Sequence, residues 1–292
     1  MSTEYGPLEP QPIEVEETRA WNEAAVGARL NAEVLLRIMP PREGSFLRPN
    51  SDDPLRNMAW FCHGLLESAA DHLVLWADYA APLKFHPDHV TVHALRPVFT
   101  LARAAIESAS QAIWVLSPED PKVRGARYIM LATWDLNEQL KAAVDEESRA
   151  ELKSRRDSIF AALGVTARTF RPPRYLDMIR EATEFLSLAE PVSMTSAGNV
   201  ERVWRCAAAA AHGKHWPEFE LHDRTEVDDG LFSSVPKIGA MSEVLEVADC
   251  LLSASVVLFA MHAGRIDDHK KLWDEAAQRL AAKVTPASTD SP

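Results

Sequence analysis

Apolar residues recur along this chain every three to four positions, and strand-like alternation never lasts for more than a few residues. This spacing places apolar side chains on one face of an α-helix. The clearest stripe is Leu55, Met58, Cys62, Leu66, Ala69, Leu73 and Trp76. We therefore predict an all-α fold, a helical bundle with appended helices, without a sheet over residues 55–265.

Prolines, glycines and capping residues mark the ends of the predicted helices. Pro40 and Pro41 end the first helix, Asp53-Pro54 opens the second, and Pro97 either kinks the third or marks its true start. Besides the helix that opens at 53, we expect helices at 14–38, 88–116, 121–144, 147–163, 175–188, 198–212, 240–263 and 268–283. We expect loops at 41–53, at 166–174 and, with an acidic composition, at 217–235.

The chain shows no internal repeat and no clear linker. We therefore expect one helical domain over residues 14–283, between a disordered N-terminus at 1–13 and a disordered tail at 284–292. The formal net charge of −12 disfavours broad coating of nucleic acid, because phosphate binding needs a basic face.

The cysteines and the N-terminus indicate the cellular compartment of the protein. The three cysteines lie in apolar helical patterns without metal-ligand spacing, which fits a reducing cytoplasm. The acidic, proline-rich N-terminus lacks the basic start and apolar run of a signal peptide. The longest apolar stretch, 250–263, is interrupted by polar residues and is too short for a membrane span. We expect a cytoplasmic protein without a membrane segment.

An arginine and a histidine lie seven residues apart on the predicted helix 198–212. That distance is close to two turns, so Arg205 and His212 share a face, and Glu201 lies one turn before Arg205. An imidazole can act as general acid or base, and an arginine can stabilise a developing phosphorane charge. A metal-free ribonuclease needs these two roles. The structural alternative is a helix-terminal histidine beside an Arg205–Glu201 ion pair.

The arrangement Arg-x6-His at the end of a late helix resembles the motif of the HEPN superfamily (higher eukaryotes and prokaryotes nucleotide-binding). The segments Ile113-Trp114-Val115-Leu116 and His212-Gly213-Lys214-His215-Trp216 are similar to marks of related bacterial helical proteins. The resemblance covers residues 55–265 and implies a metal-independent RNase site that two copies form across a dimer. Active members usually carry a polar residue after the arginine, whereas Cys206 stands here. The resemblance therefore favours a non-catalytic binding domain.

A polar stripe follows the predicted third helix in alternating steps of four and three residues. Its members are Arg96, Thr100, Arg103, Glu107, Ser110 and Trp114. An ordinary solvated face with an Arg103–Glu107 pair would explain the stripe. Alternatively it faces a groove and meets Arg205, which makes Arg96, Arg103, Glu107 and Trp114 candidate binding residues.

The segment Lys153–Arg174 reverses the charge of the chain locally. Its basic residues are Lys153, Arg155, Arg156, Arg168, Arg171 and Arg174. Such a segment could track an RNA backbone, dock on the acidic loop, or form a solvated face. We take Arg168, Arg171 and Arg174 as candidate binding residues.

Phosphate-binding loops, dinucleotide fingerprints and nucleophile elbows are absent from the sequence, so we expect no cofactor. His89 and His93 have metal-ligand spacing, but paired Glu-x-x-His motifs are missing, and we expect no metal. The small residues 207–211 and the apolar segment 251–261 offer surplus packing area, which predicts a homodimer.

Two functions remain as hypotheses. The first is a non-catalytic binding module with a polar groove around Arg205 and His212 and with RNA or a protein as its partner. The second is a metal-independent ribonuclease of toxin or defence type that acts as a dimer.

Overall fold

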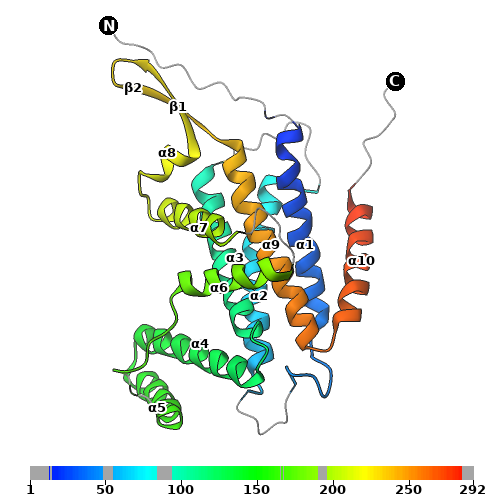
Figure 1. Cartoon of the computed structure of the whole chain (residues 1–292), viewed down its shortest axis with the longest axis vertical. Coiled ribbons are helices and arrows are strands. Elements are labelled where there is room, and N and C mark those ends of the chain that lie inside the picture. The colour runs from blue at the N-terminus through cyan, green and yellow to red at the C-terminus, as the bar shows by residue number, and fades with distance from the viewer. Residues whose placement is uncertain are drawn as a thin grey trace.

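The computed structural model of this chain describes residue 13 and residues 15–48, 55–83, 94–164, 166, 168–189 and 196–284. Within these ranges the fold is an all-α bundle with one small two-stranded sheet, which confirms the predicted class (Figure 1). The elements in chain order are η1 (Val15–Thr18), α1 (Arg19–Ile38), α2 (Met58–Ala80), α3 (Leu95–Leu116), α4 (Pro121–Ala142), α5 (Glu146–Leu163), α6 (Tyr175–Ala189), α7 (Ala197–Ala211), α8 (Pro217–Leu221), β1 (His222–Asp228), β2 (Leu231–Pro236), α9 (Ile238–His262) and α10 (Ile266–Lys283).

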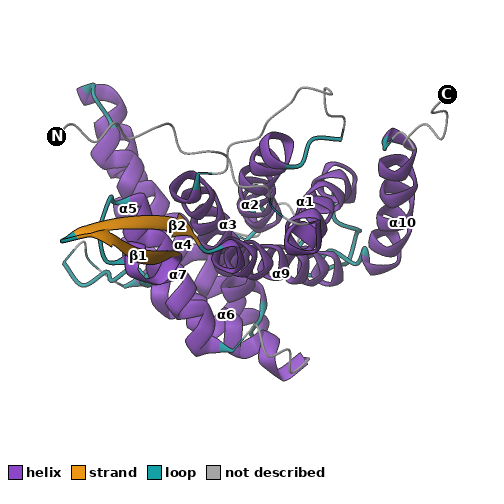
Figure 2. Ribbon diagram, turned by 90° about the horizontal axis from the view of Figure 1, so that it is seen from above, coloured by secondary structure: helices purple, strands orange, loops and turns teal. Residues whose placement is uncertain are grey.

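Helix α3 lies at the centre of the bundle. It packs against α2, α9, α7 and α6, and α1 closes the other side of α2 and α9. Figure 2 shows α3, α2, α1 and α10 following one another across the molecule, with α6 and α7 on the side away from α10. Phe99, Ile106 and Ile113 of α3 are fully buried. Burial of each such side chain stabilises the fold by about 1.5–3 kcal/mol.

Helix α9 is the most apolar element. Within the described residues it alone is long and apolar enough to cross a membrane by length and composition, and 61% of its most apolar window is buried inside the fold. Leu252, Val256 and Phe259 are fully buried, and α9 contacts both α3 and α1. In this structure α9 is a core helix of the bundle, as its interrupted apolar stretch predicted.

Helix ends follow the local signals in the sequence. Asp120 and Asp145 cap α4 and α5 by accepting hydrogen bonds from backbone N–H groups of Lys122 and Ser148. Gly164, with φ of 66°, ends α5 in the left-handed region that glycine tolerates. Pro97 lies in the first turn of α3, so it marks the start of that helix and does not kink it. The predicted starts near residues 53 and 88, and His89 and His93, lie outside the described residues.

The prediction of an acidic loop at 217–235, and of no sheet, was wrong. That segment forms α8 and an antiparallel hairpin in which β1 pairs with β2, with Asp223 opposite Val235 and Glu226 opposite Phe232. The turn Asp229-Gly230 carries the hairpin signal, and Gly230 has the positive φ of 73° that such a turn requires. The acidic composition concealed the residue types typical of strands, the alternating Thr225 and Val227 before the turn and Phe232 and Val235 after it.

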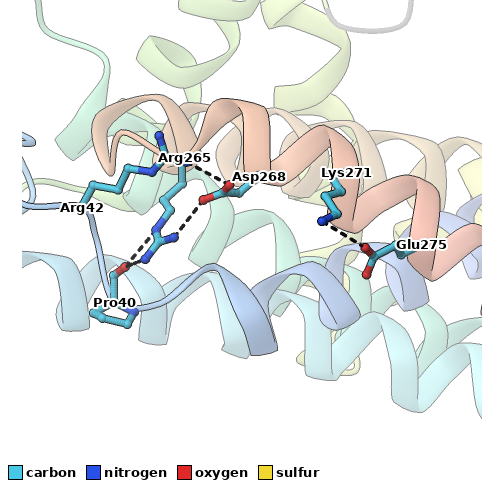
Figure 3. Close-up of polar contacts among 6 residues, drawn as sticks. All are labelled: Pro40, Arg42, Arg265, Asp268, Lys271 and Glu275. Carbon is cyan, nitrogen blue, oxygen red and sulfur yellow. Dashed lines mark hydrogen bonds and ion pairs between the residues drawn. The ribbon is translucent and has the colours of Figure 1, made fainter.

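A polar clamp fixes the corner between α9 and α10 (Figure 3). Asp268 accepts hydrogen bonds from Arg42 at 2.9 Å and from Arg265 at 2.8 Å, and Arg265 also donates to the Pro40 carbonyl. These contacts tie the segment after α1 to the start of α10. Among the described side chains of α10, Ala276 alone is fully enclosed, while Leu272 and Trp273 are partly buried against the core, so apolar and polar contacts together attach this helix.

Candidate functional site

The candidate site is a polar surface, here called the α3–α7 face, that three helices form. Its residues are Arg96, Arg103 and Glu107 of α3, Arg180 of α6, and Glu201, Trp204, Arg205 and His212 of α7. Helix α7 begins at the N-cap Ser196 and ends before Gly213, whose φ is 65°. Its alanines let the helix approach α3 closely, and this approach brings the polar side chains of the two helices together.

The Arg205–Glu201 ion pair that the helical spacing predicted is present. The Nε and Nη2 atoms of Arg205 lie 2.8 and 2.7 Å from Glu201 Oε1. Arg180, from α6, binds the other carboxylate oxygen at 2.8 Å through its Nε atom. Hydrogen bonds from Arg205 and then from Arg180 lower the pKa of Glu201. Glu201 therefore bridges two arginines, and the Arg205 side chain keeps 52% of its surface exposed.

His212 lies at the C-cap of α7 and is exposed. Its Nε2 atom lies 3.3 Å from Nη1 of Arg103, an arrangement in which the imidazole accepts a hydrogen bond from the guanidinium. The Nε atom of Arg103 donates to Glu107 at 2.8 Å. His212 therefore contacts Arg103 of α3. Arg103 belongs to the polar stripe for which one alternative predicted a contact with Arg205.

Glu107 is the most enclosed charge of the face, with 15% of its side chain exposed. Besides Arg103, it accepts a hydrogen bond from the indole of Trp204 at 2.9 Å. Tyr175, at the start of α6, lies close enough that the Glu107 charge adds to burial in raising the pKa of the phenol, while Arg103 opposes that rise. Arg103 and Glu107 therefore form the pair that an ordinary helix face predicts, and they also contact α7 through His212 and Trp204. A groove in which they meet Arg205 stays a prediction.

Arg96 marks the end of the face nearest the hairpin. It forms an ion pair with Glu218 of α8. Arg96, Thr100, Ala211 and Gly213 also border an open depression of about 500 Å³ between α3 and the end of α7. The floor of this depression is small and apolar, so a ligand group could lie beside the arginine without displacing a large side chain.

Trp114 was wrongly assigned to the groove. It is 6% exposed, and the guanidinium of Arg127 lies over its ring at 4.6 Å from the centroid. Arg127 also donates to the Trp114 carbonyl at 2.7 Å and pairs with Glu181. The Trp114 ring therefore packs in the core beneath Arg127, about three helical turns from Arg103.

The basic segment Lys153–Arg174 remains apart from the acidic hairpin. Arg156 pairs with Asp157, Arg174 pairs with Asp177, and Arg171 donates to the carbonyl of Arg168. No ion pair among the described residues joins this segment to residues 218–229, and Figure 1 shows α5 and the hairpin at opposite ends of the molecule. Docking of the segment on the acidic loop within one chain is therefore excluded, whereas its binding to RNA stays a prediction.

The surfaces on which we based a homodimer are largely used inside the chain. Ala207 and Ala210 of α7 are buried against the bundle, as are Leu251 and Val256 of α9. Cys206 is 1% exposed, and burial raises the pKa of its thiol to about 11, so it is an uncharged core residue. A homodimer stays a prediction and would have to use other surfaces.

The sequence analysis missed two members of the face, Arg180 and Trp204, and the neighbouring Tyr175. Trp204 carried a usable signal, because it directly precedes Arg205 at the edge of an amphipathic helix. Arg180 and Tyr175 belong to α6, and their sequence distance from α7 and α3 gave no sign that tertiary packing unites them.

Comparison of this chain with protein-family models, with curated proteins and with solved structures finds no match. Within the described residues, no three His, Cys, Asp or Glu side chains are grouped so that they could hold a metal ion. The α3–α7 face therefore has to be interpreted from its own chemistry.

Proposed function

We propose that this protein is a non-catalytic helical binding module whose α3–α7 face takes an anionic group of its ligand. The observation that carries this proposal is a set of ion pairs along α3, α6 and α7 in which four arginines face only three glutamates, in a protein with net charge −12. A guanidinium offers five N–H donors in a planar fork, which suits carboxylates and phosphates.

The hydrogen bonding of the face leaves donors for such a ligand. Arg205 directs its Nε and Nη2 atoms toward a single oxygen of Glu201, and that carboxylate also holds Arg180. An incoming anion can therefore use the remaining N–H groups of Arg205 without removing Glu201. Ion pairs as exposed as these contribute little stability, so exchange of partners costs little.

The same geometry speaks against catalysis as the main role. The one imidazole of the face accepts a hydrogen bond from Arg103, and the residue after Arg205 is the buried Cys206. The observation that favours the alternative, a metal-independent ribonuclease, is that Arg205 and His212 are both exposed on one face of α7. Two copies of the chain could bring these pairs together, as the resemblance to the HEPN superfamily implies.

Fluorescence anisotropy with two labelled probes tests the proposal: a 12-nucleotide single-stranded RNA and a glutamate-rich peptide of the same length, both in excess chelator. We expect binding of at least one probe by the native protein, and Arg103→Gln and Arg205→Gln each to weaken it several-fold through lost charge-assisted hydrogen bonds. Arg149→Gln on α5 removes a comparable exposed ion pair with Glu146, so it serves as the matched control without effect.

Equal affinity of the native protein, both face variants and the control would refute the proposal. Intact RNA after prolonged incubation is expected. Cleavage in chelator that His212→Ala abolishes would instead establish the ribonuclease alternative. Binding of RNA that Arg171→Gln weakens, but Arg103→Gln does not, would move the site to the basic segment.

A further inference from the structure

A second pocket lies on the other side of the bundle, between α1, α9 and α10. It is open to solvent on one side and has a volume of about 610 Å³, within the range of about 300–1,000 Å³ that is common for small-molecule sites. Val26 and Leu30 of α1 and Trp273 of α10 form its apolar wall. This pocket shares no residue with the α3–α7 face.

Asp249 of α9 brings a carboxyl group into this apolar pocket. Among the described residues its carboxyl makes no hydrogen bond or ion pair, and the Oδ1 atom is buried without a partner. Gly27 makes this position available, because a Cβ atom there would lie 2.4 Å from Oδ1. Because Gly27 has no side chain, it leaves a gap, here called the notch, that the carboxyl group occupies between α1 and α9.

A second buried acceptor lies on α1, one turn beyond Gly27. Asn31 is fully buried and donates to the Gly27 carbonyl and to the Ser253 hydroxyl, each at 3.0 Å, while its own Oδ1 atom has no partner. Ser253, which also lines the pocket, already accepts from Asn31. Buried acceptors without donors cost stability, so a group of them calls for an explanation. Neither the Asp249 Oδ1 atom nor the Asn31 Oδ1 atom receives a hydrogen bond from the described residues.

The charges around the pocket favour a positively charged ligand. Glu16 of η1 and Glu23 of α1 line it, and the one cation of the lining, Arg19, pairs with Glu23 at 2.9 Å. Glu246 of α9 lies nearby, where burial and the charge of Glu23 raise its pKa. Among the described residues no three His, Cys, Asp or Glu side chains are grouped to hold a metal ion, whereas an organic ammonium needs one counter-charge and an apolar surface.

We infer that this pocket binds a small organic cation, whose ammonium group donates to Asp249 and whose apolar body lies along Val26, Leu30 and Trp273. The aromatic wall adds a cation–π surface. The clamp in Figure 3 has a part in this site, because Arg42, Arg265 and Asp268 fix the start of α10 and thereby the position of Trp273.

Isothermal titration with three matched compounds tests the inference: 2-phenylethylamine, 2-phenylethanol and 3-phenylpropanoate. We expect the amine to bind at least tenfold more tightly than the alcohol or the acid. Asp249→Asn should reduce amine affinity at least tenfold, and Trp273→Ala should reduce it several-fold while the bundle stays folded. Glu119→Gln, the same type of charge removal at an exposed residue after α3, should have no effect.

The proton balance gives a second readout. Burial raises the pKa of Asp249 to about 7, so at pH 6 the carboxyl group is mostly protonated. An ammonium ion that binds there displaces this proton to the buffer, and the measured heat should depend on the ionisation enthalpy of the buffer. The other titratable groups of the surroundings are Glu16, Glu23, Glu246 and Cys250, and the Asp249→Asn variant separates them from Asp249.

Three outcomes would overturn the inference: no binding of the amine at millimolar concentration, equal binding of amine and alcohol, or full amine affinity in a folded Asp249→Asn variant. None of these three outcomes involves the α3–α7 face, so the test of this pocket and the test of the proposed function can fail independently.

Discussion

The α3–α7 face and the α1–α9–α10 pocket differ in whether their charged side chains have partners. On the face, Arg96, Arg103 and Arg205 each have a carboxylate within hydrogen-bond distance and remain open to water. In the pocket, the Asp249 carboxyl has no partner and lies against apolar side chains. Paired charges in water can exchange partners at little cost, whereas an unpaired buried charge destabilises the folded state until a ligand compensates it. We therefore expect the paired charges of the face to change the stability of the protein little, and the unpaired Asp249 carboxyl to change it much more.

The largest effect is expected from Asp249→Asn. The folded pKa of about 7 lies above the ordinary value of 3.8, so the unfolded chain releases the proton first as the pH rises. Native stability is therefore unaffected by this group below about pH 4, falls between about pH 4 and pH 7, and stays constant above that range. The difference in pKa corresponds to at most about 4 kcal/mol.

Urea unfolding of the native protein and of Asp249→Asn at pH 4, 6 and 8 measures this effect. The variant should gain stability relative to the native protein as the pH rises, and the gain should level off near pH 8. A difference that stays the same at all three pH values would show that the carboxyl group has its ordinary pKa and that the contrast between the two regions is unfounded.

An intermediate effect is expected from Gly27→Ala. The new Cβ atom would overlap the Asp249 carboxyl, so either that side chain or the contact between α1 and α9 has to shift. Overpacking of this kind costs about 1–3 kcal/mol. Gly198→Ala, in the first turn of α7 where the added Cβ meets open space, is the matched control and should not destabilise the protein. Equal urea midpoints for both variants would mean that the notch at Gly27 has no structural role.

The smallest effect is expected from Arg205→Ala on the face. Glu201 keeps Arg180, and Arg205 is half-exposed, so the melting temperature should barely change. Arg180→Ala should behave in the same way. The double variant leaves Glu201 without either arginine, and its loss should exceed the sum of the single losses. Calorimetry of the four proteins checks this coupling, and an Arg205→Ala variant as unstable as the double variant would contradict it.

Sequence alone predicted what depends on neighbours along the chain. Helical spacing gave the Arg205–Glu201 and Arg103–Glu107 pairs, and glycines such as Gly164 gave helix ends, because these features act over one or two turns. The hairpin was missed although the sequence contains the turn signal Asp229-Gly230. The acidic composition of the segment led to the prediction of a loop.

The remaining features depend on tertiary packing. Trp114 occupies a stripe position that looks polar on a helical projection, yet it belongs to the buried core, with Arg127 of α4 over its ring. In the sequence, Asp249 lies inside the predicted helix 240–263, directly before its apolar stretch, and nothing there marks it as unusual. Its unpaired carboxyl becomes visible only when α1 brings Gly27 against it, 222 residues away in sequence.

The attachment of α10 has a consequence for local unfolding. Its links to the bundle include the ion pairs Arg42–Asp268, Arg37–Glu275 and Arg279–Glu33, while Ala276 is its one fully enclosed described side chain. Surface ion pairs weaken as salt screens them, whereas the apolar contacts of α3 and α9 do not. The amide protons of α10 should therefore exchange before those of α3 and α9, and sooner at high ionic strength. Because Trp273 leaves with it, the pocket at Asp249 exists only while this helix is docked.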